Sequence, residues 1–408
     1  MIKVSDKFYS FLALLFVALT VFGYQIATSL FLPIMADSSS ISRTVTYPYR
    51  AIMLLLAGML IIFRPDNVVR NNNRKAALFF GGFFIIYCIR IFIDIFLFNV
   101  YVAPGFRETT ISFILFSTLP SLWAAIRCAQ YIDYDSLNGW FLYCSIAVLI
   151  IMVLNQNTLI QFEFNELTRM EANVAMNSIS LGHMGVTLFF VFFTCFITKE
   201  NGPINKVLLI ILMVLSFIIM LRAASRGPLV AFVSLFFLVI YSSLKNKILA
   251  IVVSLALLAV IWINLDSLLA FIGSISPMME QRVSAAAFDG DDSGRSFLYA
   301  NAIDIFMRNP LFGGKFVLDN GFYSHNSILD VLMGLGLFGG IAWLYLMYKD
   351  TAVSSRQIQN RSSMMIVCIL SVQMLIRCMF SGAIYTNNEL IVLMTIVLSH
   401  TQKKIAYN

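Results

Sequence analysis

The sequence predicts an all-α polytopic integral membrane protein, with about twelve transmembrane helices and one large outer loop carrying short amphipathic helices. Three observations predict this class. The chain is 60% hydrophobic and 12% charged, whereas soluble domains are about half apolar and about a quarter charged. Apolar runs near the roughly 20 residues that cross a bilayer recur along it. Lysine and arginine are concentrated between these runs, as topology signals are.

The apolar runs divide the chain into helices within 1–265, a polar loop at 266–324 and further helices within 325–408. The first run is too long for the apolar core of a signal peptide, so it predicts an uncleaved span. The six cysteines form no C-x-x-C pair, which favours packing over metal or disulfide roles. The predicted spans are 8–35, 47–63, 76–102, 109–127, 138–155, 178–198, 207–221, 228–244, 248–265, 326–348, 364–380 and 388–400.

The basic residues predict that both termini are cytoplasmic. This orientation places most basic clusters in inner loops, as the positive-inside rule requires. The net charge of +7 then reflects topology and does not indicate nucleic-acid binding. The inner residues are Arg64, Arg70, Arg74, Lys75, Lys199, Lys206, Lys245, Lys247, Lys349, Arg356, Arg361, Lys403 and Lys404.

The outer face, in contrast, carries arginine and only one lysine, Lys315. A topology signal does not distinguish the two residues, but a guanidinium is a permanently charged fork that matches two phosphate oxygens at once. The outer face therefore predicts a phosphorylated ligand; the alternative is carboxylate pairing with Glu163, Glu166 and Glu171. The outer arginines are Arg43, Arg50, Arg107, Arg169, Arg222, Arg226, Arg282, Arg295 and Arg308.

Arg222 and Arg226 form the sharpest local signal. Four residues apart, they would share a face of a continuous helix and repel each other unless an anion lay between them. Pro228 fits the first turn of the following helix, whose free N–H groups would face the same side. This pattern favours anion binding; the alternative is that both side chains extend to the membrane interface.

The polar loop predicts a helix from Ser293 or Gly294 to about Arg308, with Arg295 at its N-terminal end. This helix would lie on the membrane surface. The acidic run at 289–292 begins like a calcium loop, but the position that needs a bidentate Glu is Ala300. We interpret the run as a solvated turn.

His325 precedes the next span, and Asn326 is a candidate cap. A helix N-terminus and nearby arginines disfavour a protonated histidine, so His325 would be neutral and able to accept a proton. The alternative is a polar interfacial histidine bonded to the loop backbone. Asp330 lies five residues on, toward another helix face.

Two further patterns concern helix interiors. The G-x-G-x-x-G at 334–339 lies within a membrane span without a preceding strand, so it favours close helix packing over dinucleotide binding. Arg90 and Asp94, four apart in one span, are expected to pair. Arg377 has no obvious partner in the sequence, and a charge at that depth is typical of a functional site.

Six short motifs, in this order around one large outer loop, resemble the bacterial O-antigen polymerase and O-antigen ligase superfamily over about 222–340. The resemblance implies a metal-independent glycosyltransferase with no cofactor. Its membrane-embedded site would face the periplasm from the bacterial inner membrane. The motifs are S-R-G at 225–227, G-R at 294–295, N-P at 309–310, G-G at 313–314, S-H-N-S at 324–327 and G-x-G-x-x-G at 334–339.

The resemblance also implies roles for individual residues. Its donor would be an oligosaccharide linked to undecaprenyl diphosphate, with Arg226 and Arg295 holding the diphosphate. Preorganised cations of this kind stabilise the charge on a leaving group, so Arg295 is also a catalytic candidate. His325 would be the base near the acceptor hydroxyl. Arg222, Arg282 and Arg169 are further diphosphate candidates.

Three functions fit these expectations. The favoured one is an O-antigen or capsular polysaccharide polymerase, which transfers a growing glycan to the next lipid-linked repeat unit, with a chain-length regulator as a further partner. The alternative is an O-antigen ligase acting on lipid A-core. A flippase for lipid-linked oligosaccharide ranks third, because transporters usually show paired halves with midplane sites and this chain does not.

Overall fold

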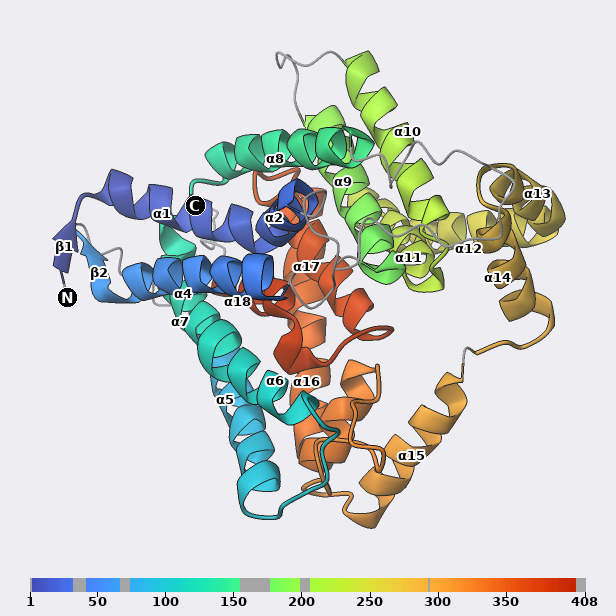
Figure 1. The fold of residues 1–408 in the computed structure, drawn as a ribbon. Helices are drawn as coiled ribbons and strands as arrows, with labels where there is room; N and C mark the ends of the chain where they lie inside the picture. Colours follow the sequence, from blue (N-terminus) through green and yellow to red (C-terminus); the bar gives the residue numbers. More distant parts are fainter. Residues whose placement is uncertain are drawn as a thin grey trace.

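The computed structural model describes residues 2–31, 42–66, 74–154, 177–198, 206–292 and 294–400, and these residues are almost entirely helical. Within these ranges the single sheet is a parallel pair of β1 (Ile2–Val4) and β2 (Phe63–Pro65), at the left of Figure 1. The predicted all-α class is confirmed.

The helices follow the predicted spans closely in the first half of the chain. The π-helical turns η1 (Leu19–Gly23) and η4 (Ile114–Thr118) each continue one span into the next helix, so two predicted spans are unbroken. The helices are α1 (Asp6–Ala18), α2 (Tyr24–Phe31), α4 (Tyr47–Ile62), α5 (Lys75–Phe96), α6 (Phe106–Phe113), α7 (Leu119–Cys128), α8 (Tyr134–Leu154) and α9 (Ser178–Thr198), with short turns η3 (Ser42–Thr46) and η5 (Ala129–Tyr131).

The second half contains the polar loop and its flanking helices. α10 (Lys206–Arg222), α11 (Arg226–Ser243) and α12 (Lys247–Ile263) precede the loop. The loop itself contains α13 (Leu265–Ile275), α14 (Pro277–Phe288) and α15 (Arg295–Arg308). The helix predicted from Gly294 to Arg308 is therefore confirmed. The chain continues with α16 (Ser327–Gln359), α17 (Met365–Cys378), η6 (Ile384–Thr386) and α18 (Asn388–Ser399).

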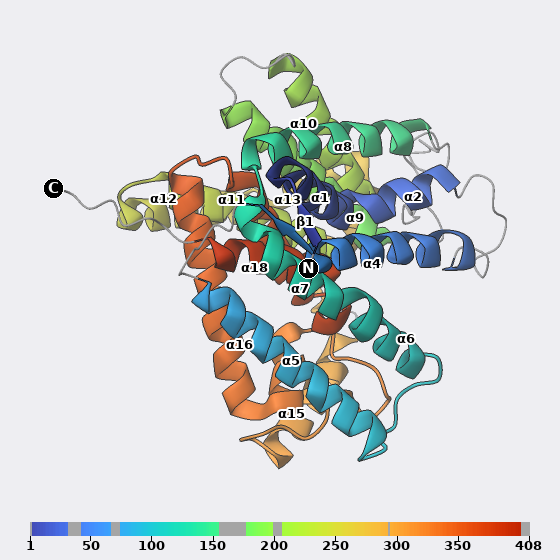
Figure 2. The ribbon, with the colours of Figure 1, turned by 90° about the vertical axis from the view of Figure 1, so that its left-hand side faces the viewer.

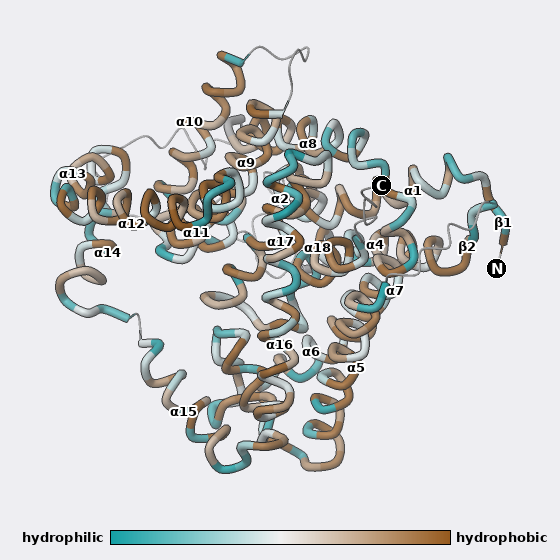
Figure 3. The backbone as a smooth tube through the Cα atoms, turned by 180° about the vertical axis from the view of Figure 1, so that it is seen from behind, coloured by the Kyte–Doolittle hydropathy of each residue, from teal (hydrophilic) through white to brown (hydrophobic). Residues whose placement is uncertain are grey.

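Eight helices among the described residues are long and apolar enough to cross a membrane, and nine if α12 and α13, which meet at 73°, form one bent span. The multi-pass membrane class is therefore confirmed, whereas the number of about twelve spans stays a prediction. Helix α12 is apolar all round, as its colour in Figure 3 shows, yet only Ala250 is buried in it. A helix that is apolar on every side but little buried by protein is stable when lipid surrounds it.

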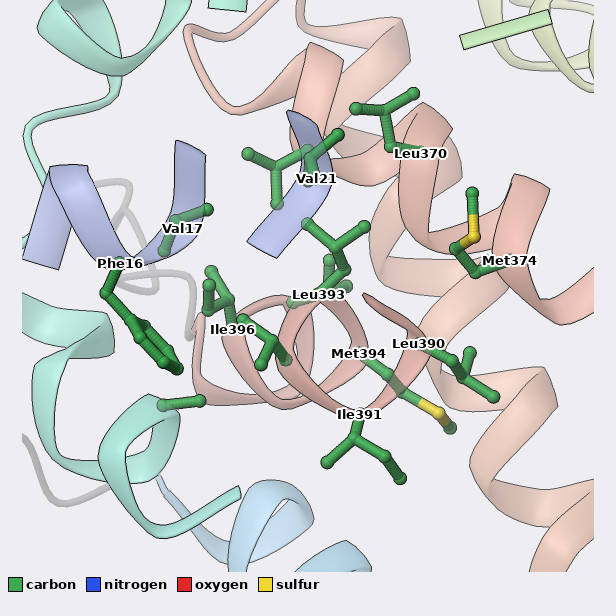
Figure 4. Close-up of a cluster of buried hydrophobic side chains, with 14 of the residues drawn as sticks. Phe16, Val17, Val21, Leu370, Met374, Leu390, Ile391, Leu393, Met394 and Ile396 are labelled. Atoms are coloured by element: carbon green, nitrogen blue, oxygen red, sulfur yellow. The ribbon is translucent and has the colours of Figure 1, made fainter. Parts of the chain in front are cut away.

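Helices α17 and α18 are shorter than a bilayer is thick. With 14 and 12 residues they extend about 21 and 18 Å, against a hydrocarbon core of roughly 30 Å. Both are enclosed by other helices: Phe16 and Val21 of the first span pack against α18 (Figure 4), and most α18 side chains are buried. Because neighbouring helices surround them, their length need not match the bilayer.

α17 and α18 lie between two groups of helices. Figures 1 and 2 show α8 to α11 on one side and α5 and α15 on the other, while the long helix α16 contacts both groups. The starts of α11 and α15 both reach Phe380, just after the end of α17.

Gly336 bends the long helix α16. Its φ of 66° interrupts the helix, and a Cβ built on it would lie 2.4 Å from the Leu311 carbonyl carbon. A Cβ on Gly313 would likewise lie 2.5 Å from Gly334. The glycines thus let the 309–314 turn lie against α16. The predicted close packing against another helix is wrong at Gly336, where the partner is this loop, and at Gly340, where a Cβ would meet Leu332 of the same helix.

Arg90 and Asp94 pair inside α5, as predicted, with Nε and Oδ1 2.9 Å apart. Both also hold the loop after α15: Arg90 donates to the Gly314 carbonyl, and Asp94 accepts from the Phe316 N–H at 2.9 Å. The pair therefore fixes the segment that leads to His325.

Candidate active site

α10 ends at Arg222 and α11 begins at Arg226, with a turn at 223–225 in which Ala224 has a φ of 47°. The two arginines therefore do not share a face of one continuous helix, whereas anion binding by the pair stays a prediction. The break itself removes the repulsion that a continuous helix would impose. Pro228 lies in the first turn of α11, as predicted.

Arg222 and Arg282 tie the polar loop to this turn. Arg222 Nη1 lies 3.5 Å from the Ile275 carbonyl oxygen at the end of α13. Arg282, from α14, donates to the Ala224 carbonyl at 3.2 Å. One contact runs from the end of α10 to the end of α13, and the other runs from α14 back to the α10–α11 turn. Together they hold α13 and α14 against the start of α11.

The acidic run is more than a solvated turn, contrary to the prediction. Asp291 Oδ2 lies 3.3 Å from Nη2 of Arg226, and its carbonyl also accepts from that guanidinium. Asp292 accepts from the backbone N–H groups of Gly294 at 2.8 Å and Ser296 at 2.7 Å. The Ser296 hydroxyl first, and then these two backbone bonds, hold the pKa of Asp292 below its usual range. Asp292 thereby caps α15.

Arg295 occupies the first position of α15, as predicted. Its Nη2 donates to the Phe380 carbonyl at 2.9 Å, and the guanidinium lies 5.8 Å from the centre of the Phe380 ring. Gly227 of α11 lies against the same residue, because a Cβ built on it would be 3.4 Å from Phe380 Cβ. Phe380, just after α17, is therefore where Arg295 and the start of α11 meet.

His325 lies in the turn before α16 with a φ of 62°, a conformation that non-glycine residues rarely adopt. Its ring packs edge-on against Tyr323, with centroids 4.5 Å apart. Burial, and then the charge of Arg295, lower the pKa of His325. The predicted neutral state is supported, although burial and not the helix terminus is the main cause.

Asp330 positions this turn, a role that the sequence did not indicate. The fully buried Asp330 accepts from both the backbone N–H of Ser324 at 2.9 Å and its hydroxyl at 2.7 Å. Asn326 caps α16, as predicted, by accepting from Ile328 at 3.0 Å and Leu329 at 3.3 Å. His325 is therefore held between two anchored residues.

The structure thus brings most of the predicted residues into one region. Arg222, Arg226 and Arg282 surround the α10–α11 turn, while Arg295 is close enough to His325 to act on its charge. Arg169 lies outside the described residues. Within the part of the chain that the structure describes, no group of His, Cys, Asp and Glu is arranged to hold a metal ion.

Residues 211–344 match the family model described as O-antigen ligase. The matched stretch runs from α10 into α16 and contains Arg222, Arg226, Arg282, Arg295 and His325. The resemblance drawn from the motifs is confirmed over this stretch, about a third of the chain. No curated protein and no solved structure matches the chain.

The O-antigen ligase match indicates a membrane glycosyltransferase-like enzyme of the O-antigen ligase and polymerase type. It does not extend to α17 and α18. Arg377, near the end of α17, for which the sequence shows no obvious partner, pairs with Glu389 of α18 at 2.6 Å. Sequence reasoning missed Glu389 because the loop at 379–387, and not a helical repeat, brings the two residues together.

Proposed function

We propose that this chain is an O-antigen or capsular polysaccharide polymerase of the bacterial inner membrane. It would transfer a growing glycan from undecaprenyl diphosphate to the next lipid-linked repeat unit, on the periplasmic side. The observation that carries the proposal is that Arg295 lies close enough to the half-buried His325 to lower its pKa, where the start of α15 meets the end of α17. A permanent cation and a neutral base are the two groups that this transfer needs.

In the proposed reaction, the acceptor hydroxyl attacks the anomeric carbon of the donor sugar and gives its proton to His325. The bond from that carbon to the diphosphate oxygen breaks, and undecaprenyl diphosphate leaves with the electron pair. Arg226 and Arg295 would stabilise the charge on the leaving oxygens, with Arg222 and Arg282 next to them and Arg169 as a further candidate. Preorganised cations are effective here because they need no reorganisation during the reaction.

The second candidate is an O-antigen ligase, which the description of the matching family favours. Both enzymes would use the same donor, so only the acceptor distinguishes them. Without a polymerase, a ligase can still attach a single repeat unit to lipid A-core. Without a ligase, no unit reaches the core and polymer remains on the lipid carrier.

Deleting the chain is therefore expected to leave lipopolysaccharide that bears one repeat unit, without a ladder of longer chains. Gel electrophoresis of the lipopolysaccharide measures this, and wild-type protein supplied from a plasmid should restore the ladder. Core without any unit, together with lipid-linked polymer, would show that the chain is the ligase.

The proposed orientation can be tested with cysteines at exposed positions. Gln281 in α14 would be periplasmic, whereas Lys245 and Asn360, in the loops after α11 and α16, would be cytoplasmic. We expect an impermeant thiol reagent to label intact cells only with Q281C. The native protein, whose described cysteines are mostly buried, gives the background. Labelling of N360C in intact cells would show that the orientation is the reverse of the proposed one.

A further inference from the structure

A polar cavity of about 270 Å³ lies outside the matched stretch, between the first, second and fourth spans and the loop that joins α17 to α18. Tyr24, Arg377 and Glu389 also line a smaller cavity of about 110 Å³ beside it. Val21, Met374 and Leu393, which belong to the core around α18 in Figure 4, line the smaller cavity. The two cavities are therefore neighbours that share Tyr24, Arg377 and Glu389, and the smaller one has an apolar base.

Polar atoms that line this space make no hydrogen bond with any described residue. Asn388 Oδ1 lacks a partner in the larger cavity. In the smaller one, so do Gln25 Oε1 and both ring nitrogens of His183, whose side chain is only 2% exposed. Buried polar groups are nearly always bonded, and an unpaired one costs roughly 1–3 kcal/mol. These groups therefore indicate an occupant that supplies hydrogen bonds.

The charged groups narrow the chemistry of that occupant. Glu389 holds Arg377 at 2.6 Å, so this pair offers both donors and acceptors. Arg50 lies 3.9 Å above the Phe113 ring and forms no ion pair within the described residues. Tyr24 and Tyr49 add aromatic rings to the same wall.

One short segment connects this cavity to the proposed active site. The carbonyl of Phe380 accepts from Arg295 at 2.9 Å, and the next two residues, Ser381 and Gly382, line the larger cavity. Ser381 in turn donates its N–H to the Arg377 carbonyl at 2.8 Å. A ligand bound at Arg295 would therefore lie across this segment from the cavity.

We propose that the cavity binds a sugar ring of the lipid-linked glycan, an inference that rests on the proposed function. A sugar has hydroxyl groups that both donate and accept, and an apolar ring face. Amides, a carboxylate, a guanidinium and tyrosine rings match these features. The larger cavity has room for on the order of nine water molecules at about 30 Å³ each, which is the scale of one pyranose ring.

A diphosphate is the other ligand that two arginines could hold. The Glu389 carboxylate disfavours it, because a second anion would lie beside a carboxylate already 2.6 Å from Arg377. A phosphate also supplies no donors for Asn388 Oδ1 and Gln25 Oε1, which can only accept. The pattern of unpaired groups therefore favours a hydroxyl-rich ligand.

The test measures binding to the purified full-length chain of three probes: lipid-linked repeat units extracted from cells lacking the chain, bare undecaprenyl diphosphate, and lipid A-core. We expect R50A to weaken binding of the repeat unit about tenfold to 100-fold, the scale of a lost hydrogen bond to a charged group. Binding of bare undecaprenyl diphosphate should not change. S117F, which fills the cavity from the fourth span, should act in the same way.

R107A is the matched control, because Arg107 is an exposed arginine above a phenylalanine ring, Phe96, at 5.4 Å. It should change neither affinity. Weaker binding of bare undecaprenyl diphosphate by R50A would place the diphosphate in the cavity and overturn the proposal. The proposal would also be overturned if R50A and S117F weakened binding of lipid A-core alone, or if neither variant changed the binding of any probe. R295K serves as the check on the proposed function: it should weaken binding of both undecaprenyl lipids, and failure there alone refutes the donor assignment.

Discussion

Replacing His325 with alanine should slow glycan transfer by about 10²–10⁴-fold, the usual contribution of a positioned general base. His325 is partly buried, packs against Tyr323 and lies near Arg295, so it stays neutral and can accept the proton of the acceptor hydroxyl. The variant should therefore leave lipopolysaccharide with one repeat unit, as deletion of the chain does. Gel electrophoresis, with the protein measured in the same membranes, gives the result.

H400A is the matched control. His400 also packs edge-on against a tyrosine, Tyr134, with ring centroids 6.4 Å apart, but it follows the end of α18 and lines a pocket with Arg356, which is not an arginine of the proposed site. It should keep the normal ladder. A normal ladder from H325A as well would mean that His325 only fills its turn.

The same histidine sets an expected pH dependence. Its pKa is lowered by burial and by Arg295, so the proton-accepting form persists below the ordinary histidine value of about 6.5. As the pH falls through this lowered pKa, His325 gains a proton and transfer should stop. The rate measured on purified enzyme should therefore stay level through neutral pH and fall only below about 6.5. A fall that begins above this value would argue against His325 as the base.

R295K should reduce transfer roughly 30- to 1000-fold, corresponding to about 2–4 kcal/mol for one partner of a buried charged pair. The guanidinium holds the Phe380 carbonyl and lies over the Phe380 ring. In the proposed reaction it also stabilises the leaving diphosphate. Lysine keeps the charge but offers a single ammonium, which cannot hold a carbonyl and two phosphate oxygens in one plane. Transfer from purified lipid-linked donor measures the loss.

R308K controls for the change of residue type within the same helix. Arg308 ends α15 and pairs with Asp304, at 2.5 Å, on an exposed face. Such surface pairs contribute little, so activity and abundance should be unchanged. Equal activity in R295K and R308K would show that Arg295 serves only as a charge at the membrane interface.

Local signals in the sequence were sufficient for several parts of the site. Asn326 caps α16, and α15 runs from Arg295 to Arg308, because a cap and a helix stop act on residues within one turn. The pairing of Arg90 with Asp94 could likewise be predicted from the sequence, since both lie on one helical face.

Contacts between residues distant in sequence could not be predicted in this way. The sequence did not show that Asp291 would meet Arg226, or that Asp330 would hold Ser324 through a reversal of the chain. The end of α10 at Arg222 is a local feature by comparison, and the predicted spans at 207–221 and 228–244 already placed a break there.

The sequence by itself determined the membrane class and most helix boundaries, because transfer of apolar side chains into lipid acts residue by residue. Only the tertiary structure decided that Arg295 and the start of α11 meet at Phe380, and that Arg50, Arg377 and Glu389 line one cavity. These residues come from helices far apart in the chain. Hydropathy indicates that such helices cross the membrane, but which of their faces meet depends on side-chain packing between them.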